Sequence, residues 1–526
     1  MRKILAATLP AFALLAACSA PAAPKTEAPA APAAPAFQRT AAVPQQAGDS
    51  YYVRAAKAVD ARIAERGVKP AKNVILFIGD GMGVSTITAA RIYAGQARGV
   101  DGESYRLTME TLPYSALSKT YSNDFQVADS ASTATAMVTG VKTNSRTLGI
   151  TSGASYDNCA TVDGHRTDSL FDLAERAGLA TGVVTTARLS HATPASTYSE
   201  TPNRDWEAYV GAQGAAAGSC EDIAAQLIDW PEGDGFEVAF GGGRSNFMKQ
   251  GTPDPEEPVK TSFRRDDRDL IAEWEAKDDH HKYITDLAGF EAEDFTGEDK
   301  VLGLFDNSHM QFDLDRADDP AGEPSLAEMT RAAITRLSQD PDGFVLMVEG
   351  GRIDHAHHAG NAARALSDTD AFDQAIAAAL DMTSRDDTLV IVTADHSHTL
   401  TISGYPSRGN PILGKVDGGA GGGYMKAIDG KPYTTLSYAN GPGACRAVGG
   451  DLVCTRLDLT DVDTTDKDFL QQSEVPMLSE AHGGEDVAVF ASGPGANLVS
   501  GVIEENEIFQ VMGRASGLVA APATDE

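Results

Sequence analysis

Short apolar segments recur along the chain and alternate with stretches of helical periodicity. Five segments are typical of buried strands in a parallel sheet: Val74–Ile78, Gly182–Thr185, Phe344–Val348, Leu389–Thr393 and Val487–Ala491. Helical patterns lie between them, as in Asp168–Ala177 and Ala362–Ala379. This alternation predicts an α/β fold with a doubly wound, mostly parallel central sheet and helices on both faces.

Two stretches interrupt the alternation. Residues 250–300 are highly charged and contain one helix-like run, DRDLIAEWEAK, and residues 402–475 are Gly-rich, with GGAGGG at 418–423. We interpret both as insertions, the second on the surface, in one large domain that spans residues 51–526.

The N-terminus has the pattern of an export signal. Arg2 and Lys3 precede the apolar run Ile4–Ala17, whose 14 residues are too few to span a bilayer. The run ends in Leu-Ala-Ala before Cys18, as in a bacterial lipoprotein, so residues 1–17 are predicted to be a lipoprotein signal peptide and Cys18 the lipidated residue. The alternative is an ordinary signal peptide with an incidental cysteine.

The segment 18–50 is rich in Ala and Pro and is predicted to be an extended tether. Together these features predict an exported lipoprotein on the periplasmic face of the outer membrane or on the cell surface. Its contact with the membrane would be through the lipid anchor only.

Charge excludes several classes of partner. The chain has 43 Lys and Arg against 75 Asp and Glu, a formal net charge of −32, and loss of Arg2 and Lys3 with the signal peptide would bring it to −34. Such a chain is a poor non-specific nucleic-acid binder and a poor polybasic membrane binder. The hydrophobic and charged fractions, 42% and 22%, are ordinary for a globular protein.

Cysteine usage fits export. If Cys18 is lipidated, an even number remains, which suggests two disulfides with three alternative pairings. We favour Cys159–Cys220 and Cys445–Cys454.

Carboxylates and imidazoles follow three of the predicted strands. The sequences are GDGMG from Gly79, EGGRIDHAHH from Glu349 and ADHSH from Ala394. Ligands of open α/β sheets bind at the carboxyl edge, and these are ligand types for zinc and, through oxygen, magnesium. Asp354 and His358 are four residues apart and would share one helical face. Each motif alone is weak, but their combination predicts a metal site.

Ser130 is the candidate nucleophile. The Ala-rich run after it, within DSASTATA, favours a helix that begins near Ser130. A helix N-terminus favours a bound phosphate, and a nearby zinc ion would activate the hydroxyl. Without the metal edge, an ordinary N-cap serine would be the better interpretation.

The chain closely resembles the alkaline phosphatase family from about Val74 to Met512. The resemblance rests on a series of long motifs in order: NVILFIGDGMG, DSASTATAMVTGVKTN, HATPASTY, VEGGRIDHAHHAGN, TADHSH and AHGGEDVAVF.

The resemblance implies a role for each matching position. Ser130 would be the phosphoserine nucleophile, and Arg204 would clamp phosphate. The first of two zinc ions would be held by Asp354, His358 and His482. The second would be held by Asp80, Asp395 and His396. Magnesium would be held by Asp80, Thr193 and Glu349, with His191 beside it. Asp129, His355 and His398 would lie behind or beside these ligands.

The sequence follows the vertebrate-type branch of the family. His191 and His355 stand where the enteric-bacterial branch has Asp and Lys. We expect a strongly alkaline pH optimum, because histidines lose their charge above neutrality. The same branch carries a calcium-like site, whose ligands would be Glu256, the Phe305 carbonyl, Asp306 and Glu323. The alternative there is a solvated acidic loop.

The predicted function is therefore metal-dependent hydrolysis of small phosphate monoesters with broad specificity. The main alternative is a phosphodiesterase or sulfatase of the same superfamily. A metal-independent mutase and a non-catalytic metal-binding lipoprotein are less consistent with the motifs. The resemblance also implies a homodimer.

Overall fold

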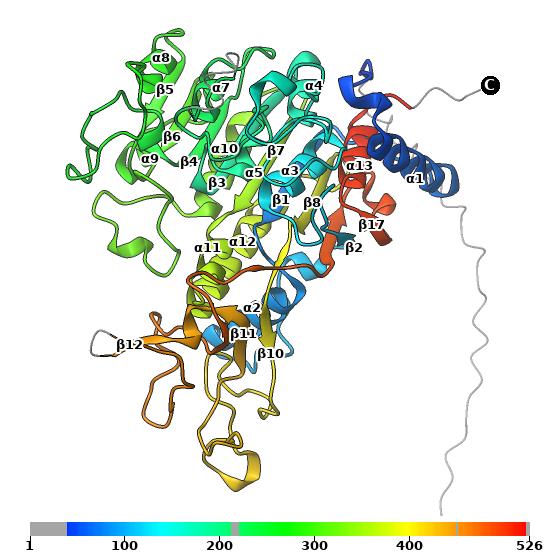
Figure 1. Ribbon diagram of the computed structural model, residues 1–526. Coiled ribbons are helices and arrows are strands. Elements are labelled where there is room, and N and C mark those ends of the chain that lie inside the picture. Colours follow the sequence, from blue (N-terminus) through cyan, green and yellow to red (C-terminus); the bar gives the residue numbers. More distant parts are fainter. Residues whose placement is uncertain (1–38, 212–219, 449–450, 522–526) are drawn as a thin grey trace, which may run out of the picture. The chain divides into compact units, whose positions relative to one another are not determined.

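The computed structural model describes residues 39–211, 220–448 and 451–521 (Figure 1). Its central sheet has ten strands in the order β17–β2–β16–β8–β1–β7–β3–β4–β6–β5. Their bounds are β1 Asn73–Gly79, β2 Tyr114–Lys119, β3 Ala180–Arg188, β4 Val238–Gly242, β5 His281–Ile284, β6 Lys300–Leu304, β7 Phe344–Gly350, β8 Thr388–Ala394, β16 Val487–Ser492 and β17 Gly501–Glu504.

Alternate side chains of the strands face two separate hydrophobic cores. In β1, Val74, Leu76 and Ile78 pack into one core, whereas Ile75 and Phe77 pack into the other. Helices of the first core are α1 Ser50–Arg66, α3 Ser130–Thr139, α4 Leu170–Arg176, α7 Ile223–Ile228 and α13 Glu507–Ser516. Helices of the second are α2 Val84–Ala97, α10 Leu326–Leu337 and α12 Ala362–Met382. The predicted fold, with helices on both faces of the sheet, is confirmed.

One predicted strand runs in the opposite direction from that expected. β16, predicted as the parallel strand Val487–Ala491, pairs antiparallel with both β2 and β8. Parallel neighbours need a crossover connection, usually a helix. The chain reaches β16 from β8 through the long segment 402–486 instead, so its direction is not constrained in that way.

The folded unit begins before residue 51. Arg39 Nη1 donates to the Ser516 carbonyl at 2.7 Å, Ala42 forms a bridge with Val519, and the Gln45 amide donates to Asp168 at 2.7 Å. Residues 39–50 are therefore not tether, because their backbone is paired with the folded chain. The predicted signal peptide and Cys18 lie outside the described residues. Among the described helices, none is both long and apolar enough to cross a bilayer.

The two expected insertions differ. Within 250–300, α8 Leu270–Glu275 and α9 Leu287–Ala292 flank β5, and β5 pairs with β6 at the edge of the central sheet. That stretch therefore contributes a strand to the edge of the central sheet. Residues 402–475 instead contribute to a small sheet of β10 Leu400–Ile402, β11 Leu436–Gly441 and β14 Ser473–Pro476, and contain the hairpin β12 Arg446–Val448 and β13 Asp451–Val453.

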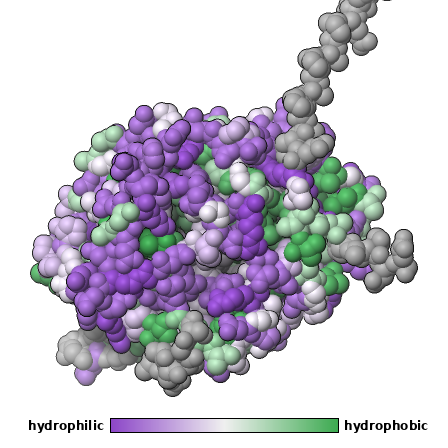
Figure 2. Space-filling model, turned by 90° about the horizontal axis from the view of Figure 1, so that it is seen from above, coloured by the Kyte–Doolittle hydropathy of each residue, from purple (hydrophilic) through white to green (hydrophobic). Residues whose placement is uncertain are grey.

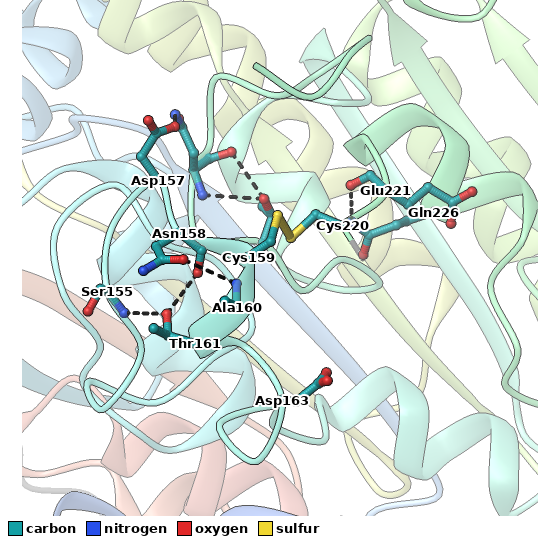
Figure 3. Close-up of a disulfide and its surroundings, with 12 residues drawn as sticks. Ser155, Asp157, Asn158, Cys159, Ala160, Thr161, Asp163, Cys220, Glu221 and Gln226 are labelled. Carbon is teal, nitrogen blue, oxygen red and sulfur yellow. Dashed lines mark hydrogen bonds between the residues drawn. A yellow bond between two sulfur atoms is a disulfide. The ribbon is translucent and has the colours of Figure 1, made fainter. Parts of the chain in front are cut away.

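Both favoured disulfides are present, Cys159–Cys220 and Cys445–Cys454. Figure 3 shows the first, which joins the turn that starts at Asn158 to the residue before Glu221. The Asn158 side chain accepts a hydrogen bond from the Ala160 amide at 3.2 Å and so caps the short helical turn that carries Cys159. The pairing predicted from the sequence is confirmed.

Hydrophilic side chains dominate the face seen from above in Figure 2.

Candidate functional site

Three neighbouring strands bring the candidate ligands to one edge of the sheet. β1 lies between β7 and β8, and Gly79 at its end is level with Gly350 and Ala394. Asp80 follows β1, Glu349 lies at the end of β7, and Asp395 and His396 follow β8. α11, Arg352–His358, then presents Asp354 and His358 one helical turn apart. The predicted convergence at the carboxyl edge is present.

Gly81 makes the sharp turn after Asp80 feasible. Its φ is +68°, and a Cβ at this position would lie 2.4 Å from the His398 ring. Only glycine meets both requirements without strain.

A first cluster consists of Asp354, His358 and His482. The Nε2 atoms of the two histidines are 3.1 Å apart and lie 3.3 and 3.5 Å from Asp354 Oδ1. Each Nδ1 faces a carbonyl, Glu480 O at 2.5 Å and Ala128 O at 2.8 Å, so we assign the ring protons there. Both Nε2 atoms are then unprotonated, and their lone pairs face each other and the Asp354 carboxylate, which is unfavourable without a cation. A cation satisfies all three atoms.

A second cluster surrounds the Ser130 hydroxyl. His396 Nε2 lies 3.4 Å from Asp80 Oδ1, 3.4 Å from Asp395 Oδ2 and 3.1 Å from Ser130 Oγ. His396 Nδ1 faces the Ser397 carbonyl, so Nε2 is again the unprotonated atom. All these side chains are buried. The candidate nucleophile thus lies directly at this second set of ligand atoms.

A third cluster shares Asp80 with the second. Ligand atoms of Asp80, His191 and Glu349 lie within 4.8 Å of one another. Asp80 Oδ2 and Glu349 Oε1 are buried acceptors with no hydrogen-bond partner among the described residues. Thr193 is buried in the short helix α5, Ala192–Ala195, directly after His191. Orphaned buried polar atoms of this kind indicate a missing ligand.

The electrostatics of the edge also favour cations. Burial and the neighbouring carboxylates Asp395, Asp354 and Glu349 raise the pKa of Asp80 well above its usual range. Burial likewise raises the pKa of Asp395, and that of Glu349 to about 7. Burial would also raise the pKa of Asp354, but His358, His398 and His482 outweigh it and hold that pKa well below its usual range. Several carboxylates buried together are costly unless cations neutralise them.

Ser130 is the first residue of α3, and Asp129 is its N-cap. The Asp129 carboxylate accepts hydrogen bonds from Arg204 Nη1 at 2.9 Å and from the Arg146 amide at 2.8 Å. Arg204 Nη2 lies 3.0 Å from His191 Nε2. The guanidinium is therefore held between the residue before Ser130 and a member of the third cluster, where it can bind phosphate oxygens.

Comparison with known proteins agrees with this geometry. A family model for alkaline phosphatase matches residues 71–518. The tissue-nonspecific alkaline phosphatase of Gallus gallus is 43% identical over 456 residues, which cover 85% of this chain and 84% of that protein. The chain belongs to the alkaline phosphatase family. The alkaline phosphatase of Gadus morhua is also 43% identical, over 85% of this chain and 92% of that protein.

Solved alkaline phosphatases share the fold. The Thermus thermophilus enzyme is 26% identical, with a TM-score of 0.60, over 86% of this chain and 92% of that chain. The enzyme from the Antarctic bacterium TAB5 is 24% identical, with a TM-score of 0.57, over 86% of this chain and all of that chain. The predicted family and fold are confirmed, and membership makes this chain a phosphomonoesterase.

One residue of the alkaline phosphatase site was missed in the sequence. Glu480 is buried and binds His398 Nδ1 and the Thr399 amide, the latter at 2.7 Å. His398 Nε2 in turn lies 2.7 Å from Asp354 Oδ1, so the expected place of His398 beside a ligand is observed. Glu480 lies two residues before His482, which could have drawn attention to it.

The calcium-like ligand set is only partly assembled as expected. Asp306 and Glu323 converge within 4.8 Å, but their third partner is Asp319, which was not predicted from the sequence. Glu256 forms an ion pair with Arg244 at 3.0 Å and also neighbours Asp319, whose pKa it helps to raise. Phe305 is buried directly before Asp306. Burial, with neighbouring carboxylates, raises the pKa of Asp319 to about 7 and that of Glu323 to about 8.

An alkaline pH optimum stays a prediction, but the pKa values of His191 and His355 do not support a loss of histidine charge above neutrality as its cause. Burial, with Arg204 close by, lowers the pKa of His191 well below its usual range. Burial, with Arg352, lowers the pKa of His355 to about 3. Burial and the nearby arginines thus favour the neutral form of both rings.

Proposed function

We propose that this alkaline phosphatase hydrolyses small phosphate monoesters through a phosphoserine at Ser130, with two zinc ions and one magnesium ion. The observation that carries the proposal is the position of Ser130 Oγ, 3.1 Å from His396 Nε2 and 3.4 Å from Asp80 Oδ1. A serine hydroxyl at the start of a helix and inside a set of metal-ligand atoms is suited to nucleophilic attack on phosphorus.

The three clusters differ in donor chemistry. Two imidazoles and a carboxylate in the first cluster, and one imidazole and two carboxylates in the second, suit zinc. The oxygen donors of Asp80, Glu349 and Thr193 in the third suit magnesium. When bound, these cations lower the pKa of a coordinated hydroxyl or water and offset negative charge in the transition state.

The side chains support an in-line displacement. Arg204, anchored by Asp129, would hold two non-bridging phosphate oxygens in its fork. Ser130 Oγ, after releasing its proton to solvent, would form the bond to phosphorus as the bond to the ester oxygen breaks on the side of Asp354, His358 and His482. The departing ester oxygen would take a proton from solvent and leave as the alcohol. Water would then attack phosphorus from that side, so that phosphate leaves and the Ser130 hydroxyl is restored.

Turnover of a chromogenic monoester and a matched diester tests the reaction class. We expect monoester hydrolysis that a chelator abolishes and zinc with magnesium restores. Faster turnover of the diester, or turnover that survives chelation, would favour the phosphodiesterase or sulfatase alternative or a metal-independent reaction.

The acidic cluster of Asp306, Asp319 and Glu323 is proposed to bind calcium, with Glu256 and the Phe305 carbonyl nearby. Its donors are hard oxygens, as calcium requires. Glu323 is 2% exposed, and its Oε2 atom has no hydrogen-bond partner within the described chain. Calorimetry on chelated protein should show one calcium site, and absence of calcium binding would refute it.

We also propose that the protein is an exported lipoprotein, anchored through Cys18, and a homodimer. Cys18→Ser should release the protein from the membrane fraction, and light scattering should give twice the chain mass. A monomer, or a Cys18→Ser variant that stays in the membrane, would refute the respective proposal.

A further inference from the structure

The loop of residues 305–311 lies between the acidic cluster and the catalytic edge. It follows β6, and Asp306 near its start belongs to the acidic cluster. His309, three residues later, contacts the histidines of the catalytic edge: its ring centroid lies 4.0 Å from that of His355 and 5.4 Å from that of His191. One short segment therefore supplies a side chain to each place.

The acidic end of the loop is tied to the cluster by its own hydrogen bonds. The Ser308 amide donates to Asp306 Oδ1 at 2.8 Å, and Gln311 Nε2 donates to Asp306 Oδ2 at 2.9 Å. The Gln311 amide donates to Glu323 Oε1 at 2.9 Å. Because the free Glu323 Oε2 is buried in the same cluster, an ion bound there would pull on residues that hold both ends of the loop.

At the other end, the His309 ring has little freedom to move independently. Arg188 Nη1 donates to His309 Nε2 at 2.5 Å, and Arg188 is itself held by Glu207, with Nη2 2.5 Å from Oε1. The ring is thus enclosed between this ion pair and the rings of His355 and His191.

The loop backbone is hydrogen-bonded to β3 and to the turn after β4. The Met310 amide donates to the Thr186 carbonyl at 3.1 Å, and the Ser245 amide donates to the Asn307 carbonyl at 3.1 Å. A Cβ at Gly242 would lie 2.1 Å from the Ser308 carbonyl oxygen, which shows how closely the loop is packed on β4. Tightly packed segments shift together rather than deform.

We propose that this loop couples the acidic cluster to the phosphate site, with His309 as the positioning residue. A divalent cation at Asp306, Asp319 and Glu323 fixes the loop, and His309 then fixes His355 and His191 beside the catalytic edge. The proposal rests on the phosphatase and calcium functions proposed above. It adds that binding of a cation at the acidic cluster and binding of phosphate at the catalytic edge affect each other's affinity, which neither proposed function implies by itself.

Calorimetry on the zinc- and magnesium-loaded enzyme tests this link, with inorganic phosphate and calcium as the probes. Calcium should tighten phosphate binding about fivefold, and phosphate should tighten calcium binding by the same factor, because coupling is reciprocal. In His309→Ala calcium should still bind, but it should no longer change the affinity for phosphate, and phosphate should no longer change the affinity for calcium. The Asn side chain of His309→Asn is too short to reach His355, so this variant should also show no coupling. It serves as a second variant in case His309→Ala does not fold.

Two further variants serve as controls. His309→Gln, whose amide oxygen can accept from Arg188 Nη1, should recover part of the coupling. His165→Ala removes another half-buried histidine, one that bonds to Thr151 Oγ1, and should keep the full factor.

Equal phosphate affinity with and without calcium in the wild type would overturn the coupling. So would unchanged coupling in both His309→Ala and His309→Asn, or the absence of calcium binding. Failure of the phosphoserine mechanism would be recognised separately, as persistent turnover by Ser130→Ala, and would leave these binding factors unchanged.

Discussion

The titration of Glu349 provides a test of whether cations stabilise the catalytic edge. In the metal-free protein burial raises the pKa of Glu349 from 4.5 to about 7, with Asp395 and Asp354 acting in the same direction. A folded-state pKa above the unfolded one means that the folded form holds the proton more tightly. Its contribution to stability is therefore present at low pH and is lost as the pH rises through about 7.

The size of the effect follows from the shift. Raising the pKa from 4.5 to about 7 corresponds to about 3 kcal/mol, most of which is lost between pH 5 and pH 8. For a chain of this length, the unfolding entropy is about 1 kcal/mol per kelvin, so the melting midpoint should shift by about 2.5 °C.

Glu349→Gln keeps the shape of the side chain and removes its titration, together with the contribution of Glu349 to the raised pKa of Asp80. We expect the midpoint of chelated wild type to fall about 2.5 °C further than that of chelated Glu349→Gln between pH 5 and pH 8. With zinc and magnesium restored, the order should reverse, and the wild type should be the more stable protein at pH 8. Parallel pH profiles of the two chelated proteins would refute the reasoning.

Four further substitutions have distinct expected outcomes. Replacing Cys159 by Ser removes a disulfide of sequence separation 61 and should lower the free energy of unfolding by about 4 kcal/mol. Replacing Cys445 by Ser removes one of separation 9 and should lower it by about 2.7 kcal/mol. Equal losses of stability in thermal unfolding would contradict this ranking. Glu480→Gln weakens the support of His398 and should lower zinc affinity about 10-fold or more, measured by competition with a chelator; wild-type affinity would show that this support is dispensable. Arg204→Lys loses the planar fork and should weaken inhibition by inorganic phosphate about tenfold, and unchanged inhibition would remove Arg204 from the phosphate site.

The sequence predicts the fold and the catalytic edge well for one physical reason. Asp80, Glu349 and Asp395 each lie at or directly after the end of a continuous apolar strand, so local pattern and position in the sheet are coupled. Neighbouring parallel strands then bring these residues together without further information.

Other features depend on contacts that no local pattern reveals. Glu480, Asp319 and His309 come from segments without strand or helix periodicity, and only tertiary packing shows what they contact. Arg39 lies close to an Ala- and Pro-rich run typical of a tether, yet its guanidinium is bound to the C-terminal helix. The direction of β16 is likewise decided by the path of the chain through the 402–486 segment.

Mass spectrometry of the enzyme, quenched in acid during turnover of a phosphate monoester, tests the central claim most directly. We predict a phosphoryl group on the peptide that carries Ser130, dependent on the bound metals and absent from Ser130→Ala, which should also lose turnover. A phosphoryl group on another residue, or turnover by Ser130→Ala at the wild-type rate, would contradict the proposal.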